Sequence, residues 1–370
     1  MKILHIISGL GSGGAQKLIE ETVPLINDYP NVEVEVLLLN DRNNVFDKKL
    51  KNSGIKVEVI PYRNPRSPLN IFYIKKYLNN GKYDIVHVHL FPTNYWVSLA
   101  SKLSFKNNHK LIFTEHSTHN IRREKWYFKY IDAFIYSNYD KVISISEKTQ
   151  ENLLTWLKIP NNKTNKFIVI ENGINVRRFF EATPYEKSEF NGNLNKDNKL
   201  LCMVGRFGKQ KDQSTIIKAM KKLPDDSHLI LIGEGELKQK NEKLAKELGV
   251  RSRVHFLGVR NDVEKILKTV DLIILSSHWE GFGLAAVEGM AAEKPVIASN
   301  VAGLREVVKG AGILFEKGNS DDLVEKINML INNRENKKYI SSLCSKRANQ
   351  YDINNMVEKY LNLYIEVLKV

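Results

Sequence analysis

The sequence KILHIISGLGSGGAQ, residues 2–16, contains an apolar run, three glycines and the start of a helical segment, in that order. The run is of strand length, and Gly9, Gly11 and Gly14 follow it with the spacing G-x-G-x-x-G. Glycines permit a tight turn and let the backbone approach a ligand. This stretch therefore predicts a strand, a glycine turn and a helix over residues 15–27, as at the start of a Rossmann-like domain.

The rest of the first half continues the alternation of short apolar runs with helix-length segments such as residues 126–138. The runs are residues 3–7, 32–39, 85–89, 111–114, 142–145 and 167–170. Such alternation is typical of a parallel sheet covered by helices. We therefore expect an α/β domain over residues 1–180.

A polar stretch with Pro184, Gly192 and several asparagines interrupts the pattern over residues 182–199, which predicts a linker and hinge. The alternation resumes with a second set of apolar runs. These are residues 200–204, 228–232, 254–257, 272–275, 295–298 and 312–315. We expect a second Rossmann-like domain over residues 200–351, with the helix 352–370 packing back on the first domain.

Length and composition exclude several classes of protein. A chain of 370 residues with 42% hydrophobic residues can bury two cores, and no apolar run reaches the roughly 18 residues of a membrane span. The N-terminus lacks the features of a signal peptide, so we expect a cytoplasmic protein. Cys202 and Cys344 are isolated from other ligands, which favours buried thiols over a disulfide or zinc site.

The net charge of +14 is concentrated in the first half. Residues 1–180 hold 26 basic and 16 acidic side chains, whereas residues 181–370 hold 30 and 26. This excess indicates attraction to a polyanion, which could be nucleic acid, an acidic membrane or a phosphorylated substrate.

The glycine turn suits a phosphate, because helix N-termini bind anions. A dinucleotide site would also need an acidic residue about 20 positions further on, and Asp41 is a poor match for it. A phosphate site at this turn therefore does not require NAD as the ligand. The alternative is a simple strand-to-helix turn that binds no ligand.

A second glycine-rich turn, HWEGFGLAAVE, follows the apolar run 272–275 and carries two carboxylates, Glu280 and Glu288. The amides of Phe282, Gly283 and Leu284 can donate to hydroxyl or phosphate oxygens, and each carboxylate can accept hydroxyl hydrogens. These properties fit a sugar and a ribose.

The loop GRFGKQKD, residues 205–212, supplies cations for a diphosphate. Arg206 and Lys211 are the candidates, with Lys209 as a substitute, and a solvated surface loop is the alternative.

Together these motifs resemble the retaining glycosyltransferases of family 4 over nearly the whole chain. They are Glu280 and Glu288, Gly205-Arg206 with Lys211, Glu171-Asn172-Gly173-Ile174-Asn175, and Ser12-Gly13-Gly14-Ala15-Gln16. The resemblance implies the GT-B fold, in which two Rossmann-like domains with doubly wound parallel sheets face a central cleft.

The resemblance also implies a role for each matching residue in binding a nucleotide-sugar. Glu280 would contact a sugar hydroxyl, Glu288 the ribose, and Arg206 and Lys211 the diphosphate. Backbone groups would complete the site: the amides of Gly13 and Gly14 on the phosphates, the amides of Phe282, Gly283 and Leu284, and the segment around Val259 on the base.

Histidines of the first domain and two departures from the family pattern, one in each domain, complete the prediction. His116 stands where family members place a histidine near the donor sugar, with a loop histidine as the alternative. His87 is expected in the core, and His89 is an undecided candidate. Gln16 replaces an acidic residue and Asp212 replaces a glycine, of which the first leaves the acceptor side less defined.

The chain contains no Asp-x-Asp sequence, so the usual carboxylates for a diphosphate-bound metal are missing. We therefore expect transfer without a metal ion, and we expect no cofactor. The resemblance implies that the transfer retains the anomeric configuration and that His116, Arg206, Lys211 and Glu280 act on a nucleotide-sugar, for which UDP is the expected nucleotide. The departing phosphate would help to deprotonate the acceptor hydroxyl.

The acceptor is expected on the first domain, where Arg122, Arg123 and Trp126 lie in a segment that interleaves cations with aromatics. The resemblance implies a glycan or lipid-diphosphate-linked saccharide, cell-surface polysaccharide assembly and the inner face of the cytoplasmic membrane. An anionic membrane surface is then a further expected partner, against the alternative of an ordinary amphipathic helix.

Three rival functions remain open. A sugar-nucleotide epimerase of the same fold would turn over donor without acceptor. An NAD-dependent dehydrogenase leaves the second-half motifs unexplained, and a nucleic-acid-binding protein would not place two carboxylates in its site.

Overall fold

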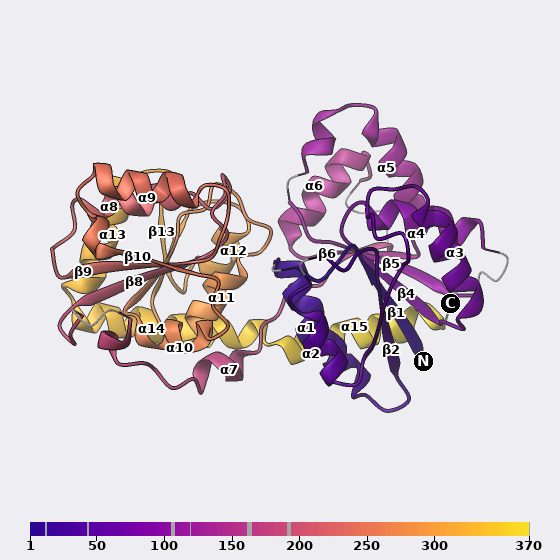
Figure 1. Cartoon of the computed structure of the whole chain (residues 1–370), viewed down its shortest axis with the longest axis horizontal. Helices are drawn as coiled ribbons and strands as arrows, with labels where there is room; N and C mark the ends of the chain where they lie inside the picture. The colour runs from indigo at the N-terminus through magenta and orange to yellow at the C-terminus, as the bar shows by residue number, and fades with distance from the viewer. Residues whose placement is uncertain are drawn as a thin grey trace. The chain divides into compact units, whose positions relative to one another are not determined.

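The computed structural model contains two units, each built around one parallel sheet (Figure 1). It describes residues 1–11, 13–42, 44–104, 108–118, 120–160, 165–190 and 194–369. Ser12 of the glycine turn, residues 191–193 of the predicted linker and Val370 of the predicted last helix lie outside these ranges. The first unit comprises Met1–Gly173 and Ile353–Val370, and the second comprises Ile174–Asp352.

The described part of the first unit has a seven-stranded sheet with the order β3-β2-β1-β4-β5-β6-β7. Its strands are β1 (Lys2–Ile7), β2 (Glu33–Leu38), β3 (Lys56–Val59), β4 (Ile85–His89), β5 (Lys110–Glu115), β6 (Lys141–Ser144) and β7 (Phe167–Val169). Its helices are α1 (Gly14–Asn27), α2 (Asp47–Asn52), α3 (Asn70–Asn80), α4 (Thr93–Lys102), α5 (Phe128–Ser137), α6 (Glu147–Leu157) and α15 (Ile353–Leu368).

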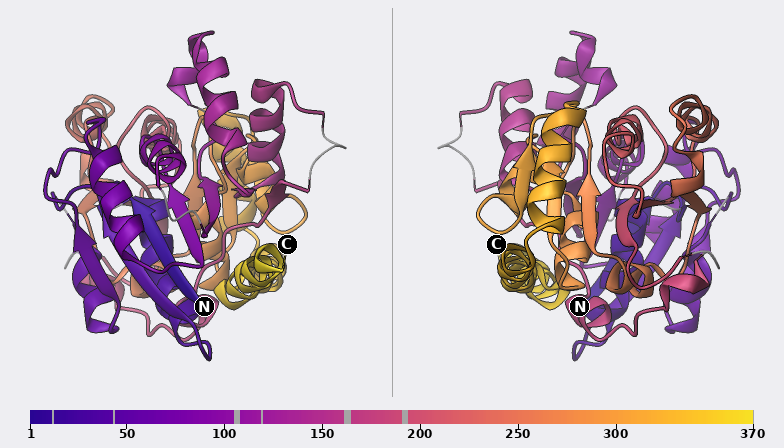
Figure 2. Two further views of the ribbon diagram at one scale, coloured as in Figure 1. Left: turned by 90° about the vertical axis from the view of Figure 1, so that its right-hand side faces the viewer. Right: turned by 90° about the vertical axis from the view of Figure 1, so that its left-hand side faces the viewer.

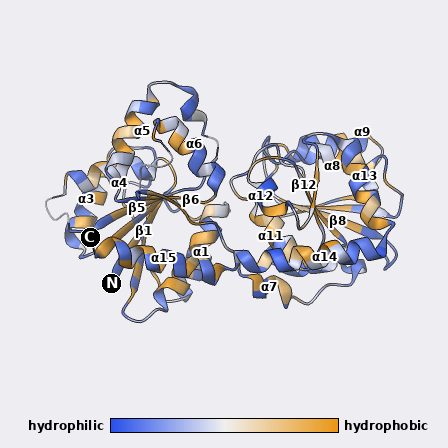
Figure 3. Ribbon diagram, turned by 180° about the vertical axis from the view of Figure 1, so that it is seen from behind, coloured by the Kyte–Doolittle hydropathy of each residue, from blue (hydrophilic) through white to orange (hydrophobic). Residues whose placement is uncertain are grey.

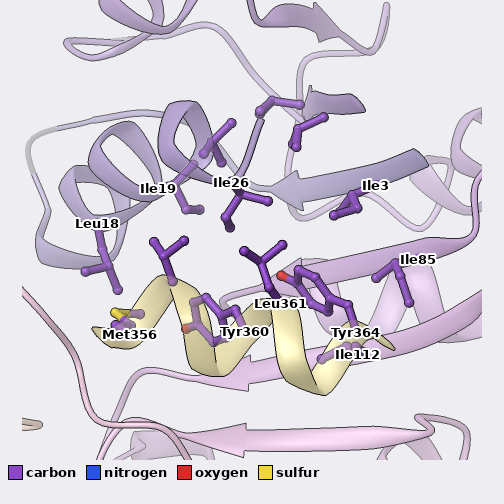
Figure 4. Close-up of a cluster of buried hydrophobic side chains, with 14 of the residues drawn as sticks. Ile3, Leu18, Ile19, Ile26, Ile85, Ile112, Met356, Tyr360, Leu361 and Tyr364 are labelled. Atoms are coloured by element: carbon purple, nitrogen blue, oxygen red, sulfur yellow. The ribbon is translucent and has the colours of Figure 1, made fainter. Parts of the chain in front are cut away.

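Alternation along these strands gives the sheet two apolar faces, each covered by helices. Ile3 and Ile85 point to the face covered by α1, α2 and α15, whereas Leu4 and Val86 point to the face covered by α3 to α6. Figure 4 shows Tyr360, Leu361 and Tyr364 of α15 against side chains of α1 and the sheet. The last helix of the chain is therefore part of the core of the first unit, and Figure 2 (left) shows it at one side of the sheet.

The described part of the second unit has a six-stranded sheet with the order β10-β9-β8-β11-β12-β13. Its strands are β8 (Lys199–Val204), β9 (Ser227–Ile232), β10 (Val254–Gly258), β11 (Leu272–Leu275), β12 (Val296–Ser299) and β13 (Ile313–Phe315). Its helices are α7 (Val176–Phe180), α8 (Gln213–Met220), α9 (Lys238–Glu247), α10 (Val263–Thr269), α11 (Leu284–Ala291), α12 (Leu304–Val308), α13 (Ser320–Ile331) and α14 (Arg334–Ala348).

Both sheets are parallel throughout their described pairings, with strands coloured as hydrophobic between helices that show polar outer faces (Figure 3). The expected α/β fold of two doubly wound domains is confirmed. Every apolar run named from the sequence contains a strand, whereas β3 and α14 were not anticipated. The division between the units falls between Gly173 and Ile174, ahead of the linker inferred from composition.

Candidate active site

The strand order of each sheet reverses at one point, and parallel sheets bind ligands there, beyond the carboxyl ends of the strands. In the second unit the reversal lies between β8 and β11, which are neighbours. The loop after β8 carries Arg206 and Lys211, and the loop after β11 carries Glu280. The topology thus brings the two loops singled out from the sequence to one edge of the sheet.

Lys211 and Glu280 form an ion pair in which the ammonium group meets Glu280 Oε1. The Glu280 side chain is only 7% exposed, and Ser277 Oγ donates to the same oxygen at 2.9 Å. Gln210 Nε2 donates to Glu280 Oε2 at 3.3 Å and to the Trp279 carbonyl at 3.0 Å. A buried carboxylate needs such partners, so the site holds Glu280 in one position before any ligand arrives.

The backbone around Glu280 depends on two glycines with positive φ. Gly283, at φ 91°, precedes the first residue of α11, and Gly303 has φ 87°. A Cβ on Gly303 would lie 2.5 Å from the Glu280 carbonyl oxygen, and one on Gly283 would lie 2.6 Å from Leu304 Cδ2. Both positions therefore exclude a side chain, which lets the β11–α11 turn pack against the start of α12.

Asp212, which departs from the family pattern, lies in the left-handed region at φ 49°. Glycine is favoured there, and aspartate is among the few other residues that tolerate it. Ser214 Oγ and Thr215 Oγ1 each donate to the Asp212 carboxylate at 2.5 Å, and Ser276 Oγ donates to its carbonyl at 2.7 Å. The structure thus explains both the usual glycine and its replacement here.

The remaining predicted donor residues differ in exposure. Arg206 is exposed and makes no ion pair with another described residue, so its guanidinium is available. Glu288 on α11 is buried at 5% exposure. Phe282 is also buried and meets Tyr351 edge-on at 5.1 Å between ring centroids. Val259, directly after β10, is 57% exposed.

In the first unit, the glycine turn leads into α1 as expected. Gly13 is the N-cap of this helix, and Gly14 is its first residue. No acidic side chain lies in the first turn, so the backbone amides are not neutralised from within it. Asp41, considered as a ribose ligand, pairs instead with Arg63 at 3.2 Å on the surface.

A row of imidazoles lies where the strand order of the first sheet reverses, between β1 and β4. His5 Nδ1 is 3.0 Å from His89 Nε2, and His89 Nδ1 is 3.1 Å from His116 Nε2. His5 and His89 are buried, whereas His116 is partly exposed. His89 therefore contacts the predicted site residue directly, and His5 contacts it through His89.

His87 belongs to the core, as expected. It is fully buried, with Nδ1 2.6 Å from the Tyr364 hydroxyl and Nε2 2.7 Å from Thr114 Oγ1. Burial lowers the pKa of His5 to about 3 and that of His116 to about 4, and it lowers the pKa of His87 and His89 well below the usual value. All four rings are therefore neutral at pH 7.

Neutral imidazoles can also bind metals. Within the described ranges, the one group of three or more candidate ligands is formed by His5, His87 and His89, whose nitrogens lie within 4.8 Å of one another. Both nitrogens of His87 and of His89 are engaged in the contacts above. Residues of the donor loops are not part of this group.

The predicted acceptor-side residues separate into two environments. Arg122 pairs with Asp132 at 3.4 Å, and Arg123 pairs with Glu115 at 2.9 Å, with side chains that are 6% and 10% exposed. Their charges are thus internal to the unit, contrary to the expected exposed surface for a headgroup. Arg122 also lines a cavity of about 330 Å³, together with Leu90, Phe91, Phe113, Glu115, Ser117 and Asn120. Trp126, in contrast, is 75% exposed.

Comparison with known proteins identifies the family of the chain. Residues 12–178 match the model of the family described as Glycosyltransferase Family 4, and residues 184–347 match that of Glycosyl transferases group 1. An uncharacterized glycosyltransferase of Methanocaldococcus jannaschii is 30% identical over 78% of this chain and 76% of its own length. The chain belongs to the group 1 and family 4 glycosyltransferases.

Two further proteins are similar to this glycosyltransferase over most of its length. The UDP-Gal:alpha-D-GlcNAc-diphosphoundecaprenol alpha-1,3-galactosyltransferase of Escherichia coli is 28% identical over 81% of this chain and 79% of its own. The structure of Anabaena HepE with UDP and glucose is 22% identical, with a TM-score of 0.86, and covers 99% of this chain and 100% of its own. This likeness shows the shared GT-B fold. None of the described helices has the length and apolarity needed to cross a membrane.

Several residues that shape the site were not singled out from the sequence. Ser277 and Gln210 hold Glu280, Gly303 allows its backbone position, and His5 extends the imidazole row. His5 was detectable in principle, because it lies in an otherwise apolar strand. Ser277 lies only three residues before Glu280, whereas the contacts of Gln210 and Gly303 with Glu280 depend on tertiary structure and have no local signal.

Proposed function

We propose that this glycosyltransferase transfers a sugar from a UDP-sugar to a lipid-diphosphate-linked saccharide, with retention and without a metal ion. The observation that carries the proposal is the Lys211–Glu280 pair at the point where the second sheet reverses its strand order. It places a cation for a phosphate beside a carboxylate for a hydroxyl. A dehydrogenase gains no support from this arrangement, whereas an epimerase would bind the same kind of donor and is distinguished by turnover of donor without acceptor.

Donor binding does not require the pair to break. An ammonium group has three donors and a carboxylate has about four acceptor sites, so Lys211 can bond to Glu280 and to a phosphate oxygen together. The exposed Arg206 would hold the diphosphate from the same loop. Glu288 would accept from the ribose, and the amides of Gly283 and Leu284 would face the phosphates.

Transfer would proceed on one face of the donor sugar. The bond between the anomeric carbon and the diphosphate oxygen breaks, and the acceptor oxygen bonds to the same face of that carbon. The hydroxyl proton passes to the departing phosphate oxygen. Arg206 and Lys211 stabilise the developing charge, which is the role a metal ion has in other transferases.

The acceptor is proposed to meet the first unit. The relative from Escherichia coli acts, by its name, on a diphosphoundecaprenol-linked sugar. In this chain the cavity beside Arg122 combines aromatic and polar side chains, a composition that suits a saccharide. His116 would lie near the donor sugar, as the family resemblance implies.

We further propose that the surface of α5 and the residues before it rests on the cytoplasmic face of an anionic membrane. Its exposed aromatic and apolar residues are Trp126, Tyr127, Tyr130, Ile131 and Phe134. Lys125 is exposed beside them, and Lys102 Nζ lies 4.6 Å from the centre of the Phe134 ring. Tryptophan and tyrosine favour the interface of a bilayer, and lysines attract anionic headgroups.

Calorimetric titration with UDP and with NAD tests the donor assignment first. We expect saturable UDP binding that Glu288→Ala abolishes, and no binding of NAD. UDP-sugars should then be screened with lipid-diphosphate-linked acceptors in the presence of EDTA, and the anomeric configuration of the product read by NMR. NAD binding without UDP binding, donor turnover without acceptor, a metal requirement or inversion would each contradict the corresponding part of the proposal.

A further inference from the structure

His116, His89 and His5 form one continuous line of imidazole contacts from a partly exposed position into the core. The two N···N distances, 3.1 Å and 3.0 Å, are those of hydrogen bonds. At the inner end, His5 Nε2 is buried and has no partner among the described residues. At the outer end, His116 Nδ1 also lacks a described partner, but its residue is partly exposed.

A neutral imidazole carries one donor nitrogen and one acceptor nitrogen, so the protons in this line are not independent. If one ring reverses its donor and acceptor, its neighbours must reverse theirs. Only two arrangements therefore satisfy both contacts. In one, His116 Nε2 donates inward and a proton ends on His5 Nε2. In the other, His5 Nδ1 donates outward and a proton ends on His116 Nδ1.

Burial at His5 distinguishes the two arrangements. The inward arrangement leaves a buried N–H group at His5 Nε2 without an acceptor, whereas the outward one leaves only an unused lone pair there. Buried N–H groups without partners are rarer in proteins than buried acceptors without partners. The outward arrangement is therefore favoured.

We propose that His89 and His5 are positioning residues that fix His116 as the tautomer with its proton on Nδ1. Nδ1 of the partly exposed His116 then donates a hydrogen bond, to a sugar hydroxyl or phosphate oxygen, and does not act as a base. This role in sugar transfer rests on the proposed function. The tautomer itself rests only on the geometry of the first unit.

The structure supplies a matched control for the line of contacts formed by His116, His89 and His5, which we call the relay. His87 lies on the same strand as His89, is equally buried, and faces the same side of the sheet. Its two nitrogens contact Tyr364 and Thr114, so it has no hydrogen bond to the relay. Its ring does pack against two rings of the relay, with centroids 4.9 Å from His5 and 4.3 Å from His89. Loss of His87 thus perturbs the same core, including this packing, but removes no hydrogen bond of the relay.

Nitrogen NMR of the full chain labelled with ¹⁵N-histidine tests the tautomer directly, with the His116 signals assigned through a His116→Gln variant. We expect protonated Nδ1 and bare Nε2 at His116. His89→Leu and His5→Phe should both shift His116 toward the Nε2–H form, although His5 does not contact His116. His87→Leu should leave the His116 signals in place, and His89→Gln, which retains an N–H donor, should preserve the tautomer better than His89→Leu.

A bare Nδ1 or an imidazolium at His116 in the wild-type protein at pH 7 would overturn the proposal. So would zinc titration that shifts His5, His87 and His89 together at stoichiometric metal, because the relay and a metal site exclude each other. Once the His116 signals are assigned through His116→Gln, the wild-type spectrum decides the tautomer even where the His89 and His5 variants do not fold.

Kinetics test the positioning role separately. His89→Leu should lower kcat for sugar transfer about tenfold, as expected for loss of one hydrogen bond of ordinary strength, with less than about a twofold change in the KM of the donor. His87→Leu should leave kcat within about twofold of wild type. An altered tautomer with unchanged kcat would refute the role in transfer. The expected tautomer in a protein without transferase activity would refute the proposed function and leave the relay standing.

Discussion

Lys211 and Glu280 form an ion pair although 69 residues separate them in the sequence. Each was expected from the sequence to contact a different part of the donor, and the structure shows that they also contact each other. The neighbouring β8 and β11 strands bring their loops together. Donor binding and local stability therefore depend on the same contact.

Removal of either partner should destabilise the second unit. Lys211→Met leaves a mostly buried carboxylate without its cation, and we expect a loss of about 3 kcal/mol in the free energy of unfolding. Urea titration measures this loss. In a double-mutant cycle with Glu280→Gln, the double variant should lose less than the sum of the single losses. Additive losses would show that the pair is not energetically coupled. Lys209→Met, at an exposed lysine of the same loop, serves as the control.

Arg206→Ala should affect turnover without affecting stability. The side chain is exposed and has no ion pair with a described residue, so its removal should change the free energy of unfolding by less than about 0.5 kcal/mol. Loss of a cation from the departing diphosphate should lower kcat by roughly 10²–10³. Steady-state kinetics with saturating donor check this, beside Lys209→Ala. Full activity in Arg206→Ala would remove it from the mechanism.

Gly303→Ala should destabilise the protein more than Gly318→Ala does. Both residues have positive φ, 87° and 76°, which costs an alanine about 1 kcal/mol. Only at Gly303 would the Cβ also meet a backbone atom, the Glu280 carbonyl oxygen at 2.5 Å, whereas nothing lies within 4 Å at Gly318. Thermal unfolding should show the difference, and UDP affinity should fall only for Gly303→Ala. Equal effects of the two substitutions would mean that the backbone at Glu280 shifts to accommodate the added Cβ at no cost in stability.

The first unit should lose stability as the pH falls below about 6.5, the ordinary pKa of histidine. Burial lowers the pKa of His5 to about 3 and of His116 to about 4. The unfolded chain therefore takes up protons that the folded chain excludes, and stability present above pH 6.5 is lost toward pH 4. Each such histidine contributes up to about 1.4 kcal/mol per pH unit. Urea titrations between pH 7.5 and 4.5 should give a shallower dependence for His5→Phe, and an unchanged slope would contradict the burial argument.

Trp126→Ala with Tyr130→Ala should weaken sedimentation with liposomes that contain anionic lipid. Both side chains are exposed, at 75% and 68%, on the surface proposed to meet the membrane. Phe72→Ala is the control, because Phe72 is 67% exposed on α3, outside that surface. Binding of the wild-type protein should fall between low and high salt, since its lysines contribute. Sedimentation that does not depend on the content of anionic lipid would favour an acceptor in solution.

Much of the fold could be predicted because its signals are local. Apolar runs located every strand of both sheets except β3, a short edge strand that is only partly buried. The helix α14 was not predicted from the sequence, because its residues, RENKKYISSLCSKRA, include few apolar side chains that would mark a buried face. The donor loops were recognisable because glycine, arginine, lysine and glutamate recur there at short spacings.

The sequence by itself determined two α/β units, the positions of all their strands except β3, the loops that follow β8 and β11, and the family. Short-range periodicity and turn chemistry specify these features, since each depends on a few consecutive residues. Only the tertiary structure decided that Lys211 meets Glu280, that Arg122 and Arg123 are paired inside the unit, and that His5 reaches His116 through His89. These contacts join residues of different strands and helices, so sheet order, register and burial select them.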